Sequence, residues 1–414
     1  MFSSFCAVTE SSPIEHRPWM HAYQFAPSLS AQLFSLKTTT PSFAKTTILV
    51  ARALGMTPDE LRACFQPAQL RHLPSITNLR SQGSPVPWDD ARYLRWRYDL
   101  EGRPDSRGCL MVVARGDQVL GMIGAENVRL IRGDQTVDAL SMMDILVDPE
   151  VDGAGLGVWL NMAIFANNPV VVEMGANPNS IGLITRLFHR LPNRKQYTVP
   201  LRFRPYLAKR WRSRTGRLAA PMLAAPANVA FKVWRAIAFH RIPSSWSLRD
   251  LTRFDDSVDR LFARRWGSDD ITFERSSRYL NWRLFENPRA KYSVLAAFEA
   301  GDMVAYVAYR ICNEASGMRI VRLIDWLVDA RHGFAGFSVL AQEIIRRALA
   351  ERVDLVSVSP LHARIERSLW RLGFLTRPSS EFATVGVSCT EPVPWPDLLD
   401  GSAWCLTDAN SDPD

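Results

Sequence analysis

One stretch of this chain of 414 residues is present twice. Residues 144–192 align without a gap on residues 325–373, so that Asp144 lies opposite Asp325 and Gly155 lies opposite Gly336. The similarity extends upstream, where RYLRWR at 92–97 matches RYLNWR at 278–283. Self-similarity at one constant offset is the signature of a repeated structural unit. The sequence therefore predicts two domains of one kind.

The order of secondary structure is clearest in the second copy. A strand is expected at 246–254, a helix capped by Asp255 at 255–267, and a second helix at 275–288 that ends at a proline. Two apolar runs joined by Gly301-Asp302 predict a hairpin, followed by a third strand at 318–329. A long helix at 337–350, a buried strand at 354–360 and a short helix at 362–374 complete the unit. The first copy follows the same order from Trp88 onward.

Composition indicates a globular protein with ample core-forming residues, since 47% of the residues are hydrophobic. No apolar run reaches the roughly 18 residues of a membrane-spanning helix, and the first residues do not resemble a signal peptide. We expect a cytoplasmic location, with or without peripheral association with the inner membrane. The six cysteines are scattered without a CxxC pair, and the histidines show no ligand spacing. Neither disulfides nor a bound metal are expected.

Positive charge is concentrated in one segment. Between Glu173 and Asp250 there is no acidic residue, whereas fifteen lysines and arginines lie there, against a net charge of +8 for the whole chain. The part from Arg194 to Arg241 predicts contact with an anionic membrane surface, an acyl carrier protein or a phosphorylated sugar. A solvated linker is the alternative. Nucleic acid is not favoured, because base-stacking aromatic residues are not regularly interleaved with the charges.

A strand, a glycine turn and a helix are expected at ILVDPEVDGAGLGVWL, residues 145–160, and the second copy closes with RLGF. This arrangement resembles the GNAT acyltransferase superfamily, and the pair of copies is similar to the tandem GNAT proteins encoded with bacterial polysaccharide genes. The closing AWCLTDANSD at 403–412 is similar to the W-x-x-T-x-x-D-S-D tail of such chains. The resemblance covers Trp88 to Asp414. It implies an α/β fold with two tandem GNAT-like domains, each on a mixed sheet.

The expected division has four parts. Residues 1–75 form a partly ordered N-terminal extension with one helix after Thr57, and residues 76–200 form the first domain with the donor loop. Residues 201–244 form a basic helical connector, expected to be irregular up to Arg217 and helical from Asn228 onward. Residues 245–414 form the second domain, whose donor loop is degenerate. Trp96 and Trp282 occupy equal places in the two copies, which indicates core packing.

A glycine turn that enters a helix can bind the diphosphate of an acyl-CoA, because free backbone N–H groups and the helix dipole attract an anion. The resemblance assigns donor contacts in the first copy to Leu146, Val147, Asp152, Gly153, Gly155, Leu156, Gly157, Asn177 and Asn179. Asp152 departs from the Arg or Gln that the family has at this place. In the second copy Ser338 replaces a glycine, and Phe334 and Phe337 crowd the turn. We therefore expect acetyl-CoA, or another acyl-CoA, in the first copy alone, although the glycines and asparagines also suit ordinary turns.

Three residues of the first copy are candidates for proton transfer. Asp144 lies in an apolar strand, where a carboxyl group with a raised pKa could accept a proton from an amine. Asp325 has the same place in the second copy, which favours a shared structural role. Glu126 on the preceding strand is a second candidate base. The family's Tyr that protonates the leaving thiolate is replaced by Phe188, so the neighbouring His189 or water is the candidate acid, and an exposed structural histidine is the alternative.

The function implied by the resemblance is transfer of an acyl group, most simply acetyl, from a CoA thioester to a small-molecule amine. The acceptor implied is an amino sugar of a surface or exported polysaccharide. A Fem-type aminoacyl transferase is one alternative, since it is also a double GNAT but uses aminoacyl-tRNA. A non-catalytic GNAT-like module that binds an acyl carrier or a polysaccharide enzyme is the other, and would account for Asp152, Ser338 and the missing Tyr.

Overall fold

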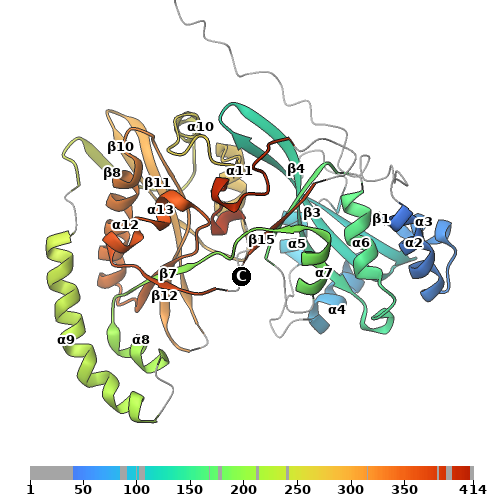
Figure 1. Cartoon of the computed structure of the whole chain (residues 1–414), viewed down its shortest axis with the longest axis horizontal. Helices are drawn as coiled ribbons and strands as arrows, with labels where there is room; N and C mark the ends of the chain where they lie inside the picture. Colours follow the sequence, from blue (N-terminus) through green and yellow to red (C-terminus); the bar gives the residue numbers. More distant parts are fainter. Residues whose placement is uncertain are drawn as a thin grey trace, which may run out of the picture.

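Two mixed β-sheets lie side by side in this chain, each with helices on both faces (Figure 1). The computed structural model describes residues 41–83, 91–98, 100–101, 108–166, 168–175, 180–210, 214–238, 242–314, 316–379, 382–387 and 394–410. Within these ranges, no helix has the combination of length and apolar content that crossing a bilayer requires.

The first sheet has the strand order β1-β2-β3-β4-β5-β15-β6, and the two-residue β9 pairs with β3. Its strands are β1 (Phe65–Pro67), β2 (Gly108–Arg115), β3 (Gln118–Arg132), β4 (Gln135–Val147), β5 (Val170–Met174), β6 (His189–Arg190), β9 (Thr272–Phe273) and β15 (Ala383–Val387). Strands β2, β3 and β4 form an antiparallel meander, and β5 runs parallel to β4. The predicted hairpin turn lies between β2 and β3.

Helices cover both faces of the first sheet. Helices α2 (Pro41–Ala53), α3 (Pro58–Cys64), α6 (Leu156–Phe165) and α7 (Ile181–Leu187) pack on the face that includes Met111 and Val113. Helices α4 (Leu73–Gly83), after the short η1 (Leu70–His72), and α5 (Ala91–Arg97) pack on the opposite face, with Leu110 and Val112. Alternate side chains of β2 thus enter different cores, as the two-residue period of a strand requires.

The second sheet has the order β14-β7-β13-β12-β11-β10-β8. Its strands are β7 (Gln196–Pro200), β8 (Trp246–Leu251), β10 (Ser293–Glu299), β11 (Asp302–Asn313), β12 (Arg319–Val328), β13 (Leu355–Val358) and β14 (Leu375–Arg377). The hairpin predicted at Gly301-Asp302 joins β10 to β11, and β13 is parallel to β12. The succession β10-β11-β12-β13 repeats the succession β2-β3-β4-β5 of the first sheet.

Helix α12 (Gly333–Ala350) covers one face of the second sheet and begins four residues before the predicted start. The other face is covered by α10 (Asp256–Ala263), α11 (Ser277–Leu280) and the π-helical η3 (Asn281–Phe285). Asp255 caps α10, as predicted, by accepting a hydrogen bond from the backbone N–H of Ser257 at 2.9 Å. The short elements α13 (Ala363–Glu366) and η4 (Leu369–Leu372) follow β13, and η5 (Gly401–Ala403) and η6 (Asp408–Asn410) lie near the C-terminus.

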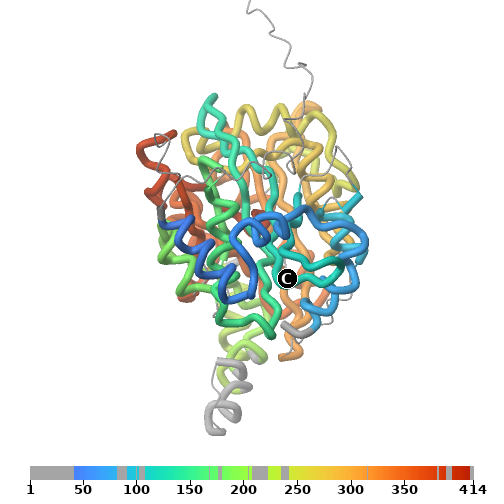
Figure 2. Tube along the Cα trace, turned by 90° about the vertical axis from the view of Figure 1, so that its right-hand side faces the viewer, coloured from blue at the N-terminus to red at the C-terminus, as the bar shows by residue number. Residues whose placement is uncertain are grey.

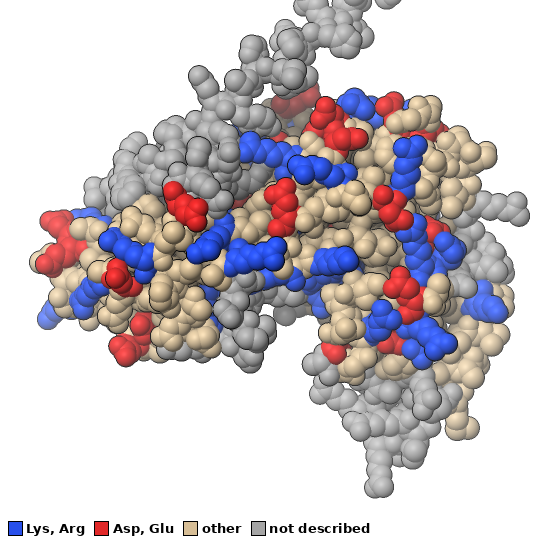
Figure 3. All heavy atoms as spheres, turned by 180° about the vertical axis from the view of Figure 1, so that it is seen from behind, with Lys and Arg blue, Asp and Glu red and all other residues tan. Residues whose placement is uncertain are grey.

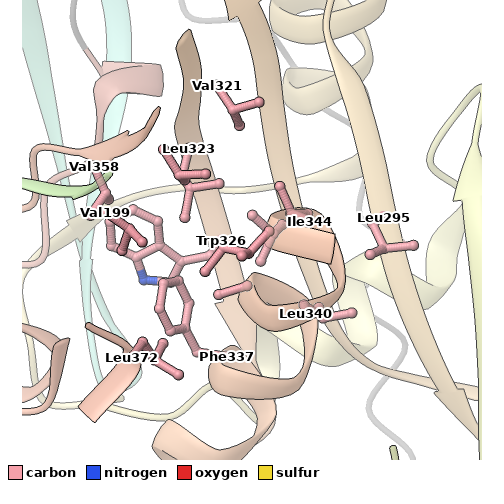
Figure 4. Close-up of a cluster of buried hydrophobic side chains, with 14 of the residues drawn as sticks. Val199, Leu295, Val321, Leu323, Trp326, Phe337, Leu340, Ile344, Val358 and Leu372 are labelled. Carbon is pink, nitrogen blue, oxygen red and sulfur yellow. The ribbon is translucent and has the colours of Figure 1, made fainter. Parts of the chain in front are cut away.

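The two sheets exchange their last strands. Strand β7, which follows the first copy, pairs antiparallel with β13 of the second sheet. Strand β15, at the end of the second copy, pairs antiparallel with β5 of the first sheet. Figure 4 shows Val199 of β7 beside Val358, in the same core of the second sheet as Trp326 and Leu372. The expected contiguous domains at 76–200 and 245–414 therefore do not follow sheet membership.

The expected N-terminal extension at 1–75 also differs from the structure within its described part. From residue 41 onward it contributes α2, α3, β1 and η1 to the first domain. Phe43 and Val50 are buried against Trp159 of α6, whose indole N–H donates to the hydroxyl of Thr47 at 3.0 Å. The predicted helix after Thr57 is α3, with a capping box between Thr57 and Glu60. This segment is part of the first core.

The basic connector is more regular than expected. After β7, helices α8 (Phe203–Arg210) and α9 (Arg214–Ala238) form a helical hairpin where an irregular segment was predicted. Helix α9 lies at the outer edge of the second domain in Figure 1, and its part drawn in yellow-green lies towards the bottom of the molecule in Figure 2. Part of the charge is neutralised internally, because Arg194 pairs with Asp408 and Arg202 pairs with Asp354. Figure 3 likewise shows cationic side chains next to acidic ones on one face of the molecule.

Candidate active site in the first domain

Strands β4 and β5 part within the first domain. Their parallel pairing ends at Met142 and Glu173, although β4 continues to Val147. A β-bulge at the same place, opposite the segment between Met122 and Gly124, turns β4 away from its neighbour. Asp144 lies in this bulge with φ of 52°, a left-handed conformation that is uncommon for a residue other than glycine. The result is a notch between the two strands. β12 and β13 part in the same way after Leu323 and Val358.

The glycine turn leads from β4 into α6 beside this notch. Gly153 has φ of 85° and Gly155, the N-cap of α6, has φ of 77°, so both positions need glycine. Gly155 provides no side-chain cap, and the N–H groups of the first helical turn are oriented as an anion site requires. Helix α2 forms one wall of the turn, since a Cβ atom on Gly155 would lie 3.5 Å from Val50. The geometry can accept an anionic group.

Acidic side chains surround the same turn. Asp148 accepts a hydrogen bond from the N–H of Glu150 at 3.0 Å, and Asp152 accepts one from the N–H of Gly153 at 3.0 Å. Asp152 is exposed beside the turn, so it adds negative charge to the place where the family binds a diphosphate. A unit negative charge about 4 Å from a phosphate would weaken its binding by about 1 kcal/mol in surroundings close to water.

The other expected donor contacts divide into three groups. Val147 lies 3.6 Å from a Cβ atom built on Gly157, so these two residues line the same wall. Leu146 packs towards α4 and α5 on the opposite face of the sheet, and Leu156 is buried against Gly121. Only the backbone of Leu156 could therefore contact a donor. Asn177 and Asn179 lie outside the described residues.

The candidate base Asp144 is held by two partners. Its carboxylate lies 3.0 Å from the guanidinium of Arg80 and accepts a hydrogen bond from the hydroxyl of Tyr98 at 2.5 Å. Its counterpart Asp325 is fully buried and is bound by Arg275, Tyr306 and Thr407. Both carboxylates therefore join separate elements of their domains, which matches the structural alternative.

The other two catalytic candidates are poorly placed for proton transfer in the notch. Glu126 is buried and its carboxylate lies 3.4 Å from the guanidinium of Arg97. His189 is exposed in β6, opposite Val385 at the far side of β15 from β5. Phe188 is buried in the core that α6 shares with the sheet, so it provides no proton.

Glu173 is the acidic residue that sequence reasoning missed. It lies in β5 at the last pair before the strands part, and only 9% of it is exposed. Its Oε2 has no hydrogen-bond partner among the described residues, and burial raises its pKa from 4.5 to about 8. The cross-strand neighbour on β15 is Thr384, whose hydroxyl is buried too. A signal was present in the sequence, since VVVEM places one carboxyl group in an otherwise apolar strand.

The corresponding turn of the second domain is closed by side chains. A Cβ atom on Gly336 would lie 2.5 Å from Val328 and 3.7 Å from Trp246. Phe337 is fully buried, and Ser338 is buried beside it. Asp329 accepts hydrogen bonds from Arg264 and Arg331 across the entrance to the turn. This turn leaves little space for a phosphate.

No group of three or more potential metal ligands occurs in the described part of the chain. The first notch combines a parted strand pair, a glycine turn and one buried carboxyl group.

No known protein family matches the chain by sequence, and no curated protein does so either. Among solved structures, a GCN5-related N-acetyltransferase from Anabaena variabilis is similar, with a TM-score of 0.51, 13% identity, and 78% of this chain and 72% of that chain covered. A probable N-acyltransferase from Enterococcus faecalis has a TM-score of 0.47 at 10% identity, with 71% and 64% covered. The N-myristoyltransferase of Saccharomyces cerevisiae, solved with myristoyl-CoA, has a TM-score of 0.49 at 14% identity, with 78% of each chain covered. The similarity to the Anabaena structure shows that the chain has a GNAT-like α/β fold.

Proposed function

We propose that this chain is a tandem GNAT-type N-acyltransferase that takes an acyl group, most simply acetyl, from an acyl-CoA in its first domain. The observation that carries the proposal is the position of Glu173. Its protonatable carboxyl group lies where β4 and β5 part, close to the sheet end from which the glycine turn enters α6. A base beside β4, the free edge of β4 and the anion site after β4 thus follow one another in the direction of this strand.

The parted strands offer contacts for an extended donor. Beyond Met142, β4 has no pairing with β5, so this edge has backbone groups available for the amides of a pantetheine arm. The first turn of α6 would hold the diphosphate through backbone N–H groups. Val147 and Gly157 would form the wall between these two contacts.

Glu173 would accept the proton of the attacking amine. The amine nitrogen adds to the thioester carbonyl carbon, the C–S bond breaks, and the CoA thiolate leaves and takes a proton from water. A carboxyl group with a pKa of about 8 is a much stronger base than an exposed one, and it works once it is ionised. Asp144 and Glu126 are already paired with Arg80 and Arg97 and would keep the surrounding strands in place.

The acceptor class follows from the resemblance to tandem GNAT proteins of polysaccharide gene clusters. We assign it as the amine of an amino sugar in a surface or exported polysaccharide. The assignment is tested by acetyl transfer from acetyl-CoA to glucosamine-type acceptors, with an amino acid and a polyamine as comparison amines.

Calorimetric titration with acetyl-CoA tests the donor site. Gly157→Glu should abolish binding, because it places a negative charge in the anion site at a position with ordinary backbone geometry, where an added Cβ atom makes only an ordinary contact with Val147 at 3.6 Å. Gly182→Glu on α7 is the matched control, since a Cβ atom there meets nothing within 4 Å. Gly155 and Gly336 are unsuitable, because the first has positive φ and the second would clash with Val328.

The result of the titration distinguishes a CoA-dependent acyltransferase from a Fem-type enzyme and from a non-catalytic binding module. Binding that Gly157→Glu abolishes and Gly182→Glu preserves supports the donor site. Absence of binding by the unmodified chain contradicts it and leaves two alternatives. Transfer from aminoacyl-tRNA would then indicate a Fem-type enzyme, and no transfer from either donor would indicate a non-catalytic binding module.

We also propose that α9 associates with an anionic membrane surface. Four apolar side chains on α9 are exposed, and Met222, Val229 and Val233 lie on one stripe of the helix, with Leu223 adjacent. The sequence of α9 contains four cationic and no acidic residues. Phe231 and Trp234 stack on each other and anchor the helix to the second domain, where Trp234 contacts Gly373. An amphipathic basic helix held at the edge of the molecule suits the headgroup region of a bilayer better than an aqueous linker.

A further inference from the structure

The notch of the second domain contains a cluster of chemically reactive side chains that the donor turn does not explain. Beyond Leu323, β12 runs on through Trp326 to Val328 without pairing to β13. A cavity of ≈ 20 Å³ lies beside this free part of β12. His362, which follows β13, and Cys405, in the C-terminal segment, both line it. Chain segments far apart in sequence therefore bring a thiol and an imidazole to one cavity.

The imidazole is held by a carboxylate. His362 Nε2 lies 3.2 Å from Asp270 Oδ2, and only 2% of His362 is exposed. The edge of its ring meets Trp266 in a T-shaped contact. Asp270 is fixed in turn by Arg364, at 3.2 Å, and by its backbone N–H, which donates to the carbonyl of Gly267 at 2.9 Å. The ring cannot turn away without breaking these contacts.

The thiol is fixed through its backbone. The N–H of Cys405 donates to the carbonyl of Ile271 at 2.8 Å, and its carbonyl accepts from the hydroxyl of Thr272 at 2.8 Å. Cys405 is only half-buried. Among the described residues, the Nδ1 atom of His362 has no hydrogen-bond partner of acceptable geometry. The charged imidazole and the ionised Cys405 thiol attract each other. Cys405, His362 and Asp270 thus stand in the order nucleophile, base and orienting carboxylate.

Electrostatics favour the ionised pair. Burial opposes charge on His362, but attraction to Cys405 and the hydrogen bond to Asp270 outweigh it and raise the pKa of His362 to about 9. Burial likewise opposes charge on Cys405, but His362 and Arg275 outweigh it and lower the pKa of the thiol. Arg265, which also lines the cavity, adds a further positive charge. Both shifts favour the thiolate–imidazolium pair over the neutral pair, and the thiolate is the nucleophilic form of cysteine.

We propose that Cys405, His362 and Asp270 form a second reactive centre, in which the Cys405 thiolate accepts a short acyl group from a thioester. The sulfur adds to the carbonyl carbon, the C–S bond of the donor breaks, and the leaving thiolate takes the proton of the His362 imidazolium. The product is S-acyl-Cys405 and a free thiol. An amine can then add to the acyl carbon; the neutral His362 imidazole takes the amine proton, the C–S bond to Cys405 breaks, and Cys405 leaves as the thiolate while the amide is released. The centre does not depend on the glycine turn of the first domain.

The cavity restricts the size of the acyl group. Its ≈ 20 Å³ only slightly exceeds the roughly 10–15 Å³ that one water molecule needs. Trp266 and Trp326 form two of its walls. A cavity of this size favours the shortest acyl groups, whereas a long acyl chain would have to displace one of these indoles.

The test is acylation of the full chain by S-acetyl-N-acetylcysteamine, a thioester without nucleotide or diphosphate. Mass spectrometry of peptides should show acetyl on Cys405, released by neutral hydroxylamine, and the decanoyl thioester should label it at least tenfold more slowly. Cys405→Ser should lose the label, whereas Cys312→Ser, which alters a half-buried cysteine of β11, should keep it. Gly157→Glu should also keep it, so that failure of the donor site and failure of this centre remain distinguishable.

The imidazole and carboxylate have their own readouts. His362→Gln should slow acetylation at pH 7 at least tenfold and restore it as pH rises towards that of an ordinary thiol. Asp270→Asn, which alters a positioning residue, should shift the same pH profile by a smaller amount, and far-ultraviolet circular dichroism should confirm that each variant is folded. Equal acetylation of Cys405 and Cys312, no acetylation of Cys405, or a rate unaffected by His362→Gln in the folded variant would each overturn the proposal.

Discussion

Trp96 and Trp282, the equivalent tryptophans of the repeated RYLxWR motif, stack on each other with ring centroids 4.8 Å apart and 20° between ring planes. The indole N–H of Trp282 also approaches the carbonyl of Trp96 at 3.4 Å. Each ring packs partly into the core of its own domain as well. Contact between a residue and its own repeat indicates that an approximate twofold axis relates the domains and passes close to this pair.

The stacked pair should couple the stabilities of the two domains. In a double-mutant cycle with Trp96→Leu and Trp282→Leu, we expect a coupling energy of about 1 kcal/mol, the usual size for an aromatic pair beyond its buried area. Urea unfolding monitored by circular dichroism measures it. Trp370, which is 67% exposed, is the control, and Trp370→Leu combined with either variant should show no coupling. Purely additive effects of Trp96→Leu and Trp282→Leu would exclude an energetic link through this contact.

Acyl transfer should follow the ionisation of Glu173. Because the ionised form is the base and its pKa is about 8, the rate should rise with pH through about 8 and then level off. Glu173→Gln should lower the rate by roughly 10²–10⁴-fold, the usual contribution of a general base, and should remove this rise. Steady-state kinetics from pH 6 to pH 10 with acetyl-CoA would measure both effects. A rise that persists in Glu173→Gln would assign the base to another residue.

The same carboxyl group should make the stability of the first domain depend on pH. Its pKa is about 8 when folded and near 4.5 when unfolded, so the folded state holds a proton that the unfolded state loses between these values. Stability should therefore fall as pH rises from 4.5 to 8. Glu173→Gln should remove this part of the decrease, which thermal unfolding at a series of pH values would reveal. Asp138→Asn, on an exposed hairpin side chain, should not change the slope.

Asp152 should weaken the binding of acyl-CoA. Asp152→Asn removes a negative charge beside the expected diphosphate, so acetyl-CoA should bind about three- to tenfold more tightly at low salt. Acetyl-pantetheine lacks the diphosphate and its affinity should stay the same. Calorimetry with both ligands makes the comparison, and Asp138→Asn serves again as the matched control. If affinity for acetyl-CoA is unchanged, the diphosphate does not lie at this turn.

Exposed apolar residues of α9 should mediate binding to vesicles. The double variant Met222→Glu and Val229→Glu should abolish co-flotation with vesicles that contain phosphatidylserine, because it disrupts the apolar stripe and adds negative charge. Ile311→Glu, which changes an apolar residue of β11 that is 38% exposed, should have no effect. Binding of the unmodified chain should weaken as salt rises. Equal flotation of both variants would argue against this surface.

The strands and helices of both copies follow from sequence patterns because each pattern is local. The hairpin at Gly301-Asp302 and the cap at Asp255 need only a turn and a few neighbouring residues, and both are present as predicted. The ungapped repeat does not hold everywhere, however. It would place Glu173 opposite Asp354, whereas strand pairing places Met142 beside Glu173 and Leu323 beside Val358. Helix α12 is longer than α6, so β13 lies further along the second copy than the ungapped alignment implies. In the strands, the residue equivalent to Glu173 is therefore Val358 and not Asp354.

Site residues were harder to predict because their roles depend on distant partners. Asp144 looked like a base in an apolar strand, and only the fold brings Arg80 and Tyr98 to it. His362 and Cys405 stand in unremarkable sequence contexts, and the C-terminal segment brings the thiol to the imidazole through its bridge with Ile271. No periodicity or fixed spacing in a single sequence indicates that Asp144 meets Arg80 and Tyr98, or that His362 meets Cys405.

Because of the strand exchange, the first sheet cannot be completed until nearly the whole chain has been synthesised. Strand β5 acquires its neighbour β15 only after the ribosome has added residues 175–382, which takes on the order of 10–40 s at roughly 5–20 residues per second. During this interval the first sheet has one edge open to pairing with other chains. The second sheet, in contrast, receives β7 before any of its own strands are made. A nascent chain that stops before residue 383 would therefore retain this open edge, so full-length synthesis itself is a condition for protecting the first domain from aggregation.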